Sequence, residues 1–341
     1  MQEFKVLVRC FTYNHSNYIQ DTMNGFIIQE TDFPYVCAIV DDCSKDNEDV
    51  VIEDYLKENF YLGDSAETEN TNDYRFIYTQ HKKNKNCYFA VFLLKYNHQS
   101  VGKLKNTYLN RWISKVKYIS ICEGDDYWID PYKLQKETDV LDGNNKVMLV
   151  HTGFDTVDSV GNKIYIPLYE RHKKVSKSGF VLPRLLKNNY IMTLTIMFRK
   201  DFEENSLLKN IPIDYDYSRF LCAAAIGEFE YISDITGCYR ITTTGAVSTR
   251  NNDIQKWRHV VTRYIAEEFC NGNIKIPKQR KVFLISLLLN AIDSQYSLYS
   301  LLKKNKQLIV LLPFAFFVKL LDSILYRCKK KYDAYSLLFG L

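Results

Sequence analysis

The 341-residue chain has no CxxC pair, and its nine cysteines are scattered without a Cys/His cluster. An odd, unpatterned set argues against a disulfide framework and against a structural zinc site. Internal repeats, low-complexity segments and a basic-then-apolar signal pattern at the N-terminus are also absent from the sequence. These absences predict a cytoplasmic protein in a reducing compartment.

Excess positive charge is missing from most of the chain. Residues 302–341 contain eight Lys/Arg and two Asp, a net charge of +6, whereas the remaining residues sum to −1. A body with that balance does not predict nucleic acid as a partner.

The chain also lacks a clean apolar run of the roughly 20 residues that a membrane-spanning helix needs. The nearest run, 308–326, is interrupted by Pro313, Lys319 and Asp322, and a basic stretch follows it to residue 331. One interpretation of 308–331 is an amphipathic helix that contacts the inner face of the cell membrane. The alternative is a helix that packs on the rest of the protein.

Through the first half of the chain, short apolar runs alternate with segments in which apolar residues recur at helical spacing. Strands are expected at 4–10, 35–40, 75–79, 118–122, 146–151, 190–199, 228–232 and 237–241, and helices at 18–29, 49–59, 105–115, 131–141 and 215–226. Beyond residue 254 the pattern is helical. The alternation predicts an open, largely parallel α/β sheet, in which ligands bind at the carboxyl ends of the strands.

An acidic segment, Glu123-Gly124-Asp125-Asp126, follows the expected strand 118–122. Carboxylates at the end of a core strand are costly to desolvate unless positive charge meets them. Mn2+ or Mg2+ suits such hard oxygen ligands, and a metal there would bridge a diphosphate. The alternative is an acidic turn that caps the next helix.

Two other polar loops follow expected strands. Asp41 and Asp42 could accept hydrogen bonds from a nucleoside, or could form an Asx turn. Thr12, Tyr13 and Asn14 could line the same pocket, with Tyr13 against a base, or could form a polar turn.

Later in the chain, Asp214 and Asp216 precede a helical run, where an Asp is either a helix cap or a general base. Arg240 precedes a hydroxyl-rich loop, which suits a phosphate clamp or a solvent salt bridge.

In this order the motifs resemble the family 2 glycosyltransferases (GT2), the large inverting group with a GT-A fold. The similarity covers roughly residues 4–250. It rests on Cys10-Phe11-Thr12-Tyr13-Asn14, Val40-Asp41-Asp42-Cys43-Ser44-Lys45-Asp46, the DxD-like Glu123-Gly124-Asp125-Asp126-Tyr127-Trp128 continued by Asp130-Pro131-Tyr132-Lys133-Leu134, Asp216-Tyr217, and Tyr239-Arg240 with the loop to Ser248.

The resemblance implies a GT-A catalytic domain over residues 1–250, an open mixed sheet flanked by helices, and a helical extension over 251–341. It implies inverting transfer of a hexosyl or N-acetylhexosaminyl group from a nucleotide-diphosphate sugar, with UDP favoured. The implied acceptor is a glycan or lipid-linked glycan of polysaccharide biosynthesis.

The resemblance also implies roles for individual residues. Asp216, or Asp214 two residues earlier, would be the catalytic base. Asp125 and Glu123 would hold the metal. The nucleotide sugar would be bound by Thr12, Tyr13, Asn14, Asp41, Asp42, Lys105, Asn106, Glu123, Asp126, Trp128 and Arg240.

The chain departs from the family pattern at several positions. Phe11 replaces a Pro, Cys43 a Gly and Glu123 an Asp, and Lys105-Asn106 is the nearest match to an Arg-Asn pair. Two other functions compete. A sugar-phosphate nucleotidyltransferase is disfavoured because residues 11–17 contain no Gly, Lys or Arg. A non-catalytic, membrane-surface protein that binds nucleotide sugars is disfavoured by the intact acidic positions Asp125, Asp126 and Asp216.

Overall fold

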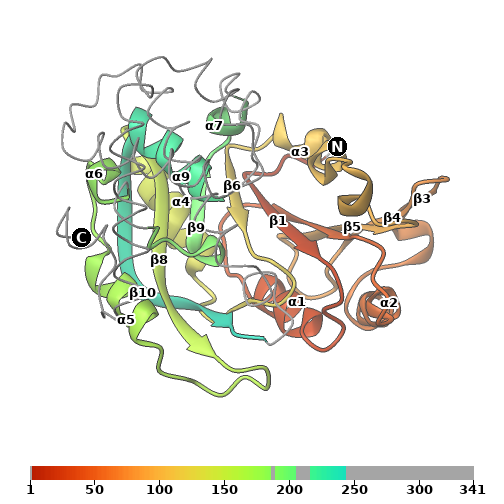
Figure 1. The fold of residues 1–341 in the computed structure, drawn as a ribbon. Helices are drawn as coiled ribbons and strands as arrows, with labels where there is room; N and C mark the ends of the chain where they lie inside the picture. The colour runs from red at the N-terminus through yellow and green to blue at the C-terminus, as the bar shows by residue number, and fades with distance from the viewer. Residues whose placement is uncertain (1, 186–188, 205–215, 243–341) are drawn as a thin grey trace, which may run out of the picture. The chain divides into compact units, whose positions relative to one another are not determined.

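A computed structural model describes residues 2–185, 189–204 and 216–242 (Figure 1). In chain order its strands and helices are β1 (Val6–Thr12), α1 (Ile19–Ile27), β2 (Tyr35–Asp41), α2 (Glu48–Asn59), β3 (Glu67–Asn70), β4 (Tyr74–Gln80), β5 (Cys87–Leu94), α3 (Asn110–Ile113), β6 (Tyr118–Ile121), β7 (Tyr127–Trp128), α4 (Lys133–Gly143), β8 (Val147–Val157), α5 (Pro167–Val175), α6 (Leu182–Leu185), β9 (Ile196–Arg199), α7 (Lys200–Glu204), α9 (Asp216–Ile226) and β10 (Glu228–Arg240).

The chain divides into two units. One contains residues 1–209 and 226–245, and the other contains residues 210–225 and 246–341. All of the described strands belong to the first unit, and most of α9 belongs to the second. The predicted domain boundary at residue 250 and the predicted helical extension lie outside the described residues.

Within the described residues the strands form one sheet in the order β3-β4-β5-β2-β1-β6-β9-β8-β10-β7. The neighbours β5, β2, β1 and β6 are parallel, and β8 and β10 are also parallel. The remaining pairs, including those of β9, are antiparallel. The α/β class with an open mixed sheet, predicted from the sequence, is confirmed.

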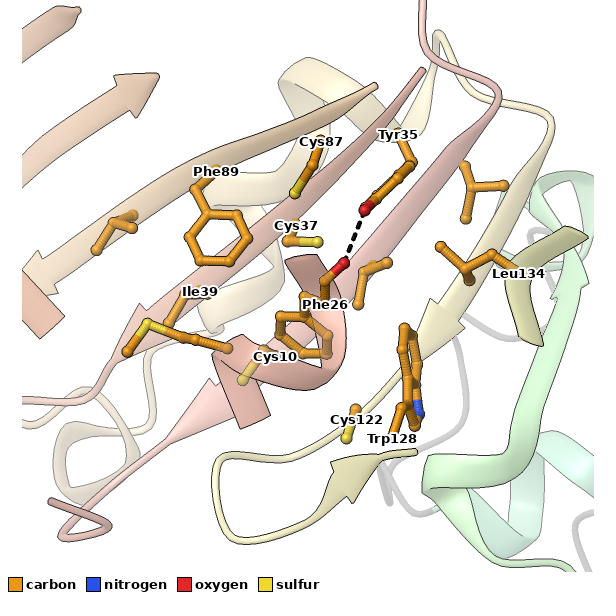
Figure 2. Packing of buried hydrophobic residues seen from close by; sticks show 14 of the residues in the cluster. Cys10, Phe26, Tyr35, Cys37, Ile39, Cys87, Phe89, Cys122, Trp128 and Leu134 are labelled. Carbon is orange, nitrogen blue, oxygen red and sulfur yellow. Dashed lines mark hydrogen bonds between the residues drawn. The ribbon is translucent and has the colours of Figure 1, made fainter. Parts of the chain in front are cut away.

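The parallel centre of the sheet is buried on both faces, so its strands are almost continuously apolar. Every residue of β2 is buried. Helix α1 contributes a stripe at helical spacing, Ile19, Met23 and Phe26, to the same core. Figure 2 shows Phe26 facing Phe89 of β5 and Trp128, and the Tyr35 hydroxyl donates to the Phe26 carbonyl at 2.7 Å.

Four thiols, those of Cys10, Cys37, Cys87 and Cys122, lie in this core (Figure 2). Burial raises the pKa of the Cys10, Cys37 and Cys122 thiols well above the usual range. A thiol that stays protonated is a poor nucleophile, so these side chains act as small apolar residues.

The predicted elements differ from the observed ones in several places. Strands β3, β5 and β7 and helices α5, α6 and α7 were not predicted, and the helix predicted at 105–115 is α-helical only in α3. The two strands predicted at 228–232 and 237–241 form one strand, β10, with register irregularities between Ile232 and Gly237. The strand predicted at 190–199 is confined to β9, because residues 193–195 form a 3-10 turn.

Candidate active site

The carboxyl ends of β1, β2 and β6 meet at one edge of the sheet. Thr12, the last residue of β1, pairs with Asp41, the last residue of β2. Backbone hydrogen bonds continue past the strand ends: the Asp42 N–H donates to the Thr12 carbonyl at 3.0 Å, and the Gly124 N–H to the Phe11 carbonyl at 3.1 Å. The three polar loops that follow these strands are therefore neighbours, as the parallel arrangement predicted.

Gly124 permits the closest of these approaches. A Cβ at this position would collide with the Thr12 hydroxyl and would lie 3.1 Å from Nδ1 of His15. Only glycine lets the acidic loop lie directly against the loop after β1. From α1, the Thr22 hydroxyl lies 3.0 Å from the Gly124 carbonyl and 2.6 Å from the Asp126 carbonyl, which ties the loop down from the helix side.

The three carboxylates of the acidic loop differ in their surroundings. Asp126 is 4% exposed and accepts a hydrogen bond from the Arg240 N–H at 2.8 Å. Burial, and then the neighbouring charge of Asp125, raise the pKa of Asp126 well above its usual range. Glu123 and Asp125 are only partly buried. These two side chains are thus the accessible carboxylates, whereas Asp126 supports the loop.

The accessible carboxylates of Glu123 and Asp125 suit a divalent cation that takes most of its ligands from a bound phosphate and water. In the part of the chain that the structure describes, no group of three or more His, Cys, Asp or Glu residues is arranged to hold a metal ion. Mg2+ sites commonly use one or two carboxylates, with substrate phosphates and water completing the coordination. Glu123 and Asp125 fit that pattern, so a metal here would depend on an anionic ligand.

Arg240, at the end of β10, is 4% exposed and bonded through its whole guanidinium group. Nε donates to the Asp125 carbonyl at 2.9 Å, Nη1 to the Ser159 carbonyl at 3.2 Å, and Nη2 to the Asp21 carboxylate at 2.7 Å. Two aromatic rings flank it, those of Tyr18 and Tyr127, with centroids at 4.7 and 5.0 Å. Arg240 therefore holds the acidic loop in place, and its predicted contact with a diphosphate stays a prediction.

Asp42 is 1% exposed and organises the segment that carries Lys105. Its carboxylate accepts hydrogen bonds from the His98 N–H at 2.6 Å, the Gln99 N–H at 3.2 Å and the Lys105 ammonium at 3.1 Å. The structure thus brings the predicted residues Asp42 and Lys105 together. Asn106 lies beside them, and its Oδ1 accepts from Nη1 of Arg9 at 3.5 Å.

Asp41 forms the Asx turn that was the alternative reading of its motif. Its carboxylate accepts the Ser44 hydroxyl and, at 3.2 Å, the Ser44 N–H. Burial raises the pKa of Asp41 to about 7, and the charge of Glu48 adds to the rise, while the Ser44 hydrogen bonds lower it. Cys43 within this turn has a φ of 61°, which explains why a glycine is usual there in the family that the motif resembles.

Glu48, the first residue of α2, was not predicted from the sequence. Its fully buried carboxylate accepts hydrogen bonds from the Thr12 hydroxyl and the His15 N–H (2.9 Å), and one of its oxygens lies 2.8 Å from the Ser44 hydroxyl oxygen. One side chain therefore links the loops after β1 and β2. The only sequence signal for it is an acid in the first turn of a helix, which helices generally favour.

The other predicted residues of the first two loops are placed differently. Asn14, with a φ of 59°, links the loops because its N–H donates to the Ser44 hydroxyl (2.8 Å) and its Oδ1 accepts from the Lys45 N–H (2.7 Å). Tyr13 is 40% exposed, so its ring is accessible to a ligand.

Trp128 requires a correction. The sequence placed it among the ligand-binding residues, but the indole is 2% exposed and packs edge-on against Phe26 with ring centroids 5.1 Å apart (Figure 2). Its Nε1–H donates to the Leu194 carbonyl at 2.9 Å. Trp128 is therefore a core residue that anchors the end of the acidic loop.

The predicted base lies elsewhere in the chain. Asp216 is the first residue of α9, in the second unit, and Asp214 lies outside the described residues. Either role of Asp216, helix cap or base, stays a prediction. None of the described helices is long and apolar enough to cross a membrane, and the segment 308–331 lies outside the described residues.

Comparison with solved structures identifies the fold. The crystal structure of S. aureus TarS 1-349 in complex with UDP-GlcNAc matches with a TM-score of 0.54 and 18% identity, over 85% of this chain and 73% of that chain. The fold is the GT-A fold. At this level of identity the GT-A match establishes architecture alone.

Sequence comparisons add distant relatives. No family profile matches the chain. Uncharacterized proteins of Mycobacterium tuberculosis and Mycobacterium bovis are 24% identical over 249 residues, which is 72% of this chain. The chain spans 61% of the length of these curated relatives.

Proposed function

We propose that this protein is a metal-assisted glycosyltransferase that uses a nucleotide-diphosphate sugar. One observation carries the proposal: the acidic loop lies at the carboxyl end of β6, packed against the loop that ends β1, which in turn contacts the loop that ends β2, in a GT-A fold. Ligands of open α/β sheets bind at such edges. TarS, which shares the fold, was crystallised with UDP-GlcNAc, so UDP-sugars are the first donors to test.

Different residues of the site would bind different parts of the donor. Tyr13 offers an accessible ring on which a nucleobase can stack. Asp42 and Lys105, joined by an ion pair of 3.1 Å, would border the bound nucleoside. Glu123 and Asp125 would hold Mn2+ or Mg2+, which when bound supplies electrostatic stabilisation to a departing diphosphate.

The chemistry proposed is a single displacement with inversion. Asp216 accepts the proton of the acceptor hydroxyl, whose oxygen attacks C1 of the sugar on the face opposite the diphosphate. A positioned base of this kind contributes about 10²- to 10⁴-fold to the rate. The sugar is hexosyl or N-acetylhexosaminyl in this proposal, which extends the GT2 resemblance.

The proposed acceptor is a glycan or lipid-linked glycan at the cytoplasmic face of the membrane. The basic, apolar segment 308–331 motivates this choice. Co-sedimentation of the full chain with anionic liposomes tests it: the chain should bind, and a chain truncated after residue 301 should not. Equal binding of the two chains to the liposomes would contradict membrane contact through residues 308–331.

A thermal-shift screen tests the proposed function and identifies the donor. A ligand stabilises the fold by RT ln(1 + [L]/Kd), so the correct nucleotide sugar with Mn2+ should raise the melting temperature above all others. Asp125→Asn should lose the Mn2+-dependent part of the shift. Asp54→Asn, on the surface of α2, is the matched control and should keep it. A panel of nucleoside diphosphates and nucleotide sugars without any shift would count against the proposal.

A further inference from the structure

His15 lies between the loop after β1 and the acidic loop, and neither the sequence motifs nor the proposed mechanism gives it a role. Its Nδ1 is 3.2 Å from the Thr12 hydroxyl oxygen, and its Nε2 is 3.8 Å from Oδ2 of Asp125. Its backbone N–H donates to Glu48 at 2.9 Å, so the residue is held from two sides. The side chains of His15 and Asp125 are each 23% exposed, so both reach the solvent-facing edge of the site.

The hydrogen bonds around Thr12 determine which nitrogen of His15 carries the hydrogen. A threonine hydroxyl has one proton to donate. Thr12 gives that proton to the buried carboxylate of Glu48. Its oxygen therefore accepts from His15, which places a hydrogen on Nδ1 and leaves Nε2 as the ring nitrogen that faces Asp125. Metal-binding histidines are oriented in this way, by a hydrogen bond from the other ring nitrogen.

The distance between the two side chains suits a shared cation. A separation of 3.8 Å is too long for a hydrogen bond, which ends near about 3.2 Å. It is shorter than twice a metal–ligand distance of about 2.1 Å. One ion can therefore contact Nε2 of His15 and Oδ2 of Asp125 together. The glycine at 124 makes this approach possible, because a Cβ there would press on Thr12 and His15.

We propose that His15 is a further ligand of the divalent cation, together with Asp125, and that it shifts the preference of the site from Mg2+ toward Mn2+. The proposal rests on the proposed function, since a diphosphate and water complete the coordination. Imidazole nitrogen suits the transition metals, whereas Mg2+ strongly prefers oxygen ligands.

Pulsed EPR of bound Mn2+ tests the proposal directly. The full-length protein with Mn2+, with and without UDP, should show electron-spin-echo modulation from a coupled imidazole nitrogen. Growth with ¹⁵N-histidine should change that signal from the ¹⁴N to the ¹⁵N pattern, without any substitution. His15→Gln should abolish the nitrogen coupling. His172→Gln, which changes a histidine of α5 instead, should keep it.

Affinity provides a second readout. His15→Gln should weaken Mn2+ binding in the presence of UDP by about tenfold or more, and Mg2+ binding by clearly less. Equal losses for the two metals would contradict the selectivity. Mn2+ bound without nitrogen coupling would overturn the His15 assignment and leave the proposed glycosyltransferase intact. Failure of Mn2+ to bind at all, with or without UDP, would overturn both.

Discussion

The carboxylate of Asp126 accepts a hydrogen bond of 2.8 Å from the backbone N–H of Arg240, which lies 114 residues further along the chain. The Arg240 side chain binds the same loop through the Asp125 carbonyl, at 2.9 Å. Hydrogen bonds from both the backbone and the side chain of Arg240 therefore join the end of β10 to the acidic loop. The position of the accessible carboxylate of Asp125 depends on an arginine that need not contact the substrate.

Arg240→Lys should destabilise the protein. A lysine cannot reproduce the three hydrogen bonds of the guanidinium group, so the carbonyls of Asp125 and Ser159 lose their donors, at about 1 kcal/mol for each lost hydrogen bond. Urea unfolding measures the change. Arg111→Lys is the control, because the partly exposed Arg111–Glu67 pair should contribute no more than about 1 kcal/mol. Equal losses in the two variants would contradict the role given to Arg240.

Asp41→Asn should stabilise the protein at high pH. Burial raises the folded-state pKa of Asp41 to about 7, above an unfolded value of about 3.9, so the folded state binds the proton more tightly. Stability contributed by this group is present at low pH and is lost as the pH rises from about 4 to 7. The gain from Asn should therefore be largest above pH 7, with an upper limit of about 4 kcal/mol, and absent near pH 4.

Urea midpoints at pH 5 and pH 8 measure this difference between Asp41→Asn and the wild type. Asp54→Asn, which removes a surface carboxylate of α2, controls for the general loss of one negative charge. A gain in the free energy of unfolding that is the same at pH 5 and pH 8 would contradict a raised pKa of Asp41 in the folded protein.

The fully buried ion pair of Lys133 and Glu137 should respond non-additively to mutation. Both side chains are 0% exposed, with Nζ–Oε contacts of 2.7 and 2.6 Å, and the ammonium lies 4.7 Å from the Trp128 ring. Lys133→Met should cost about 3–5 kcal/mol, because it leaves a buried carboxylate unpaired, whereas adding Glu137→Met should recover most of the loss. A double-mutant cycle by urea unfolding measures the coupling, and simple additivity would contradict it.

Trp128→Phe should separate stability from ligand binding. The change removes the hydrogen bond to the Leu194 carbonyl and part of the packing against Phe26, so unfolding should become easier by about 1–3 kcal/mol. Because the indole is buried, the affinity for the nucleotide that the thermal-shift screen identifies should change less than about twofold, a few tenths of a kcal/mol. A large loss of affinity in a protein of unchanged stability would restore the sequence-based assignment of Trp128 to the ligand.

The sequence was most informative where an apolar run ends in a polar loop. Strands β1, β2 and β6 were predicted for that reason, and their loops do meet. Strand β5 was missed because it lies between β4 and β2 and is almost wholly buried, so its residues show no alternation. The exposed residues 233–235 made β10 look like two strands, since the bulges there expose side chains in the middle of the strand.

Within the site, the sequence identified the acidic loop but not the side chains that position it. Glu48 and His15 gain their partners only through the register of β1 against β2 and the close approach at Gly124, which no local pattern encodes. Trp128 adjoins the motif in sequence, yet the chain turns it into the core. Proximity along the chain was therefore a poor guide to which residues face a ligand.

Turnover of a nucleotide sugar tests the central claim most directly. Purified full-length protein, given Mn2+ and the donor chosen by thermal shift, should release the nucleoside diphosphate, and NMR should detect a sugar product of inverted anomeric configuration. Asp125→Asn should reduce the rate by at least about a hundredfold, a transition-state effect of about 2.7 kcal/mol, while Asp54→Asn should leave it unchanged. Release that persists undiminished in Asp125→Asn, or no release from any donor that binds, would contradict the account.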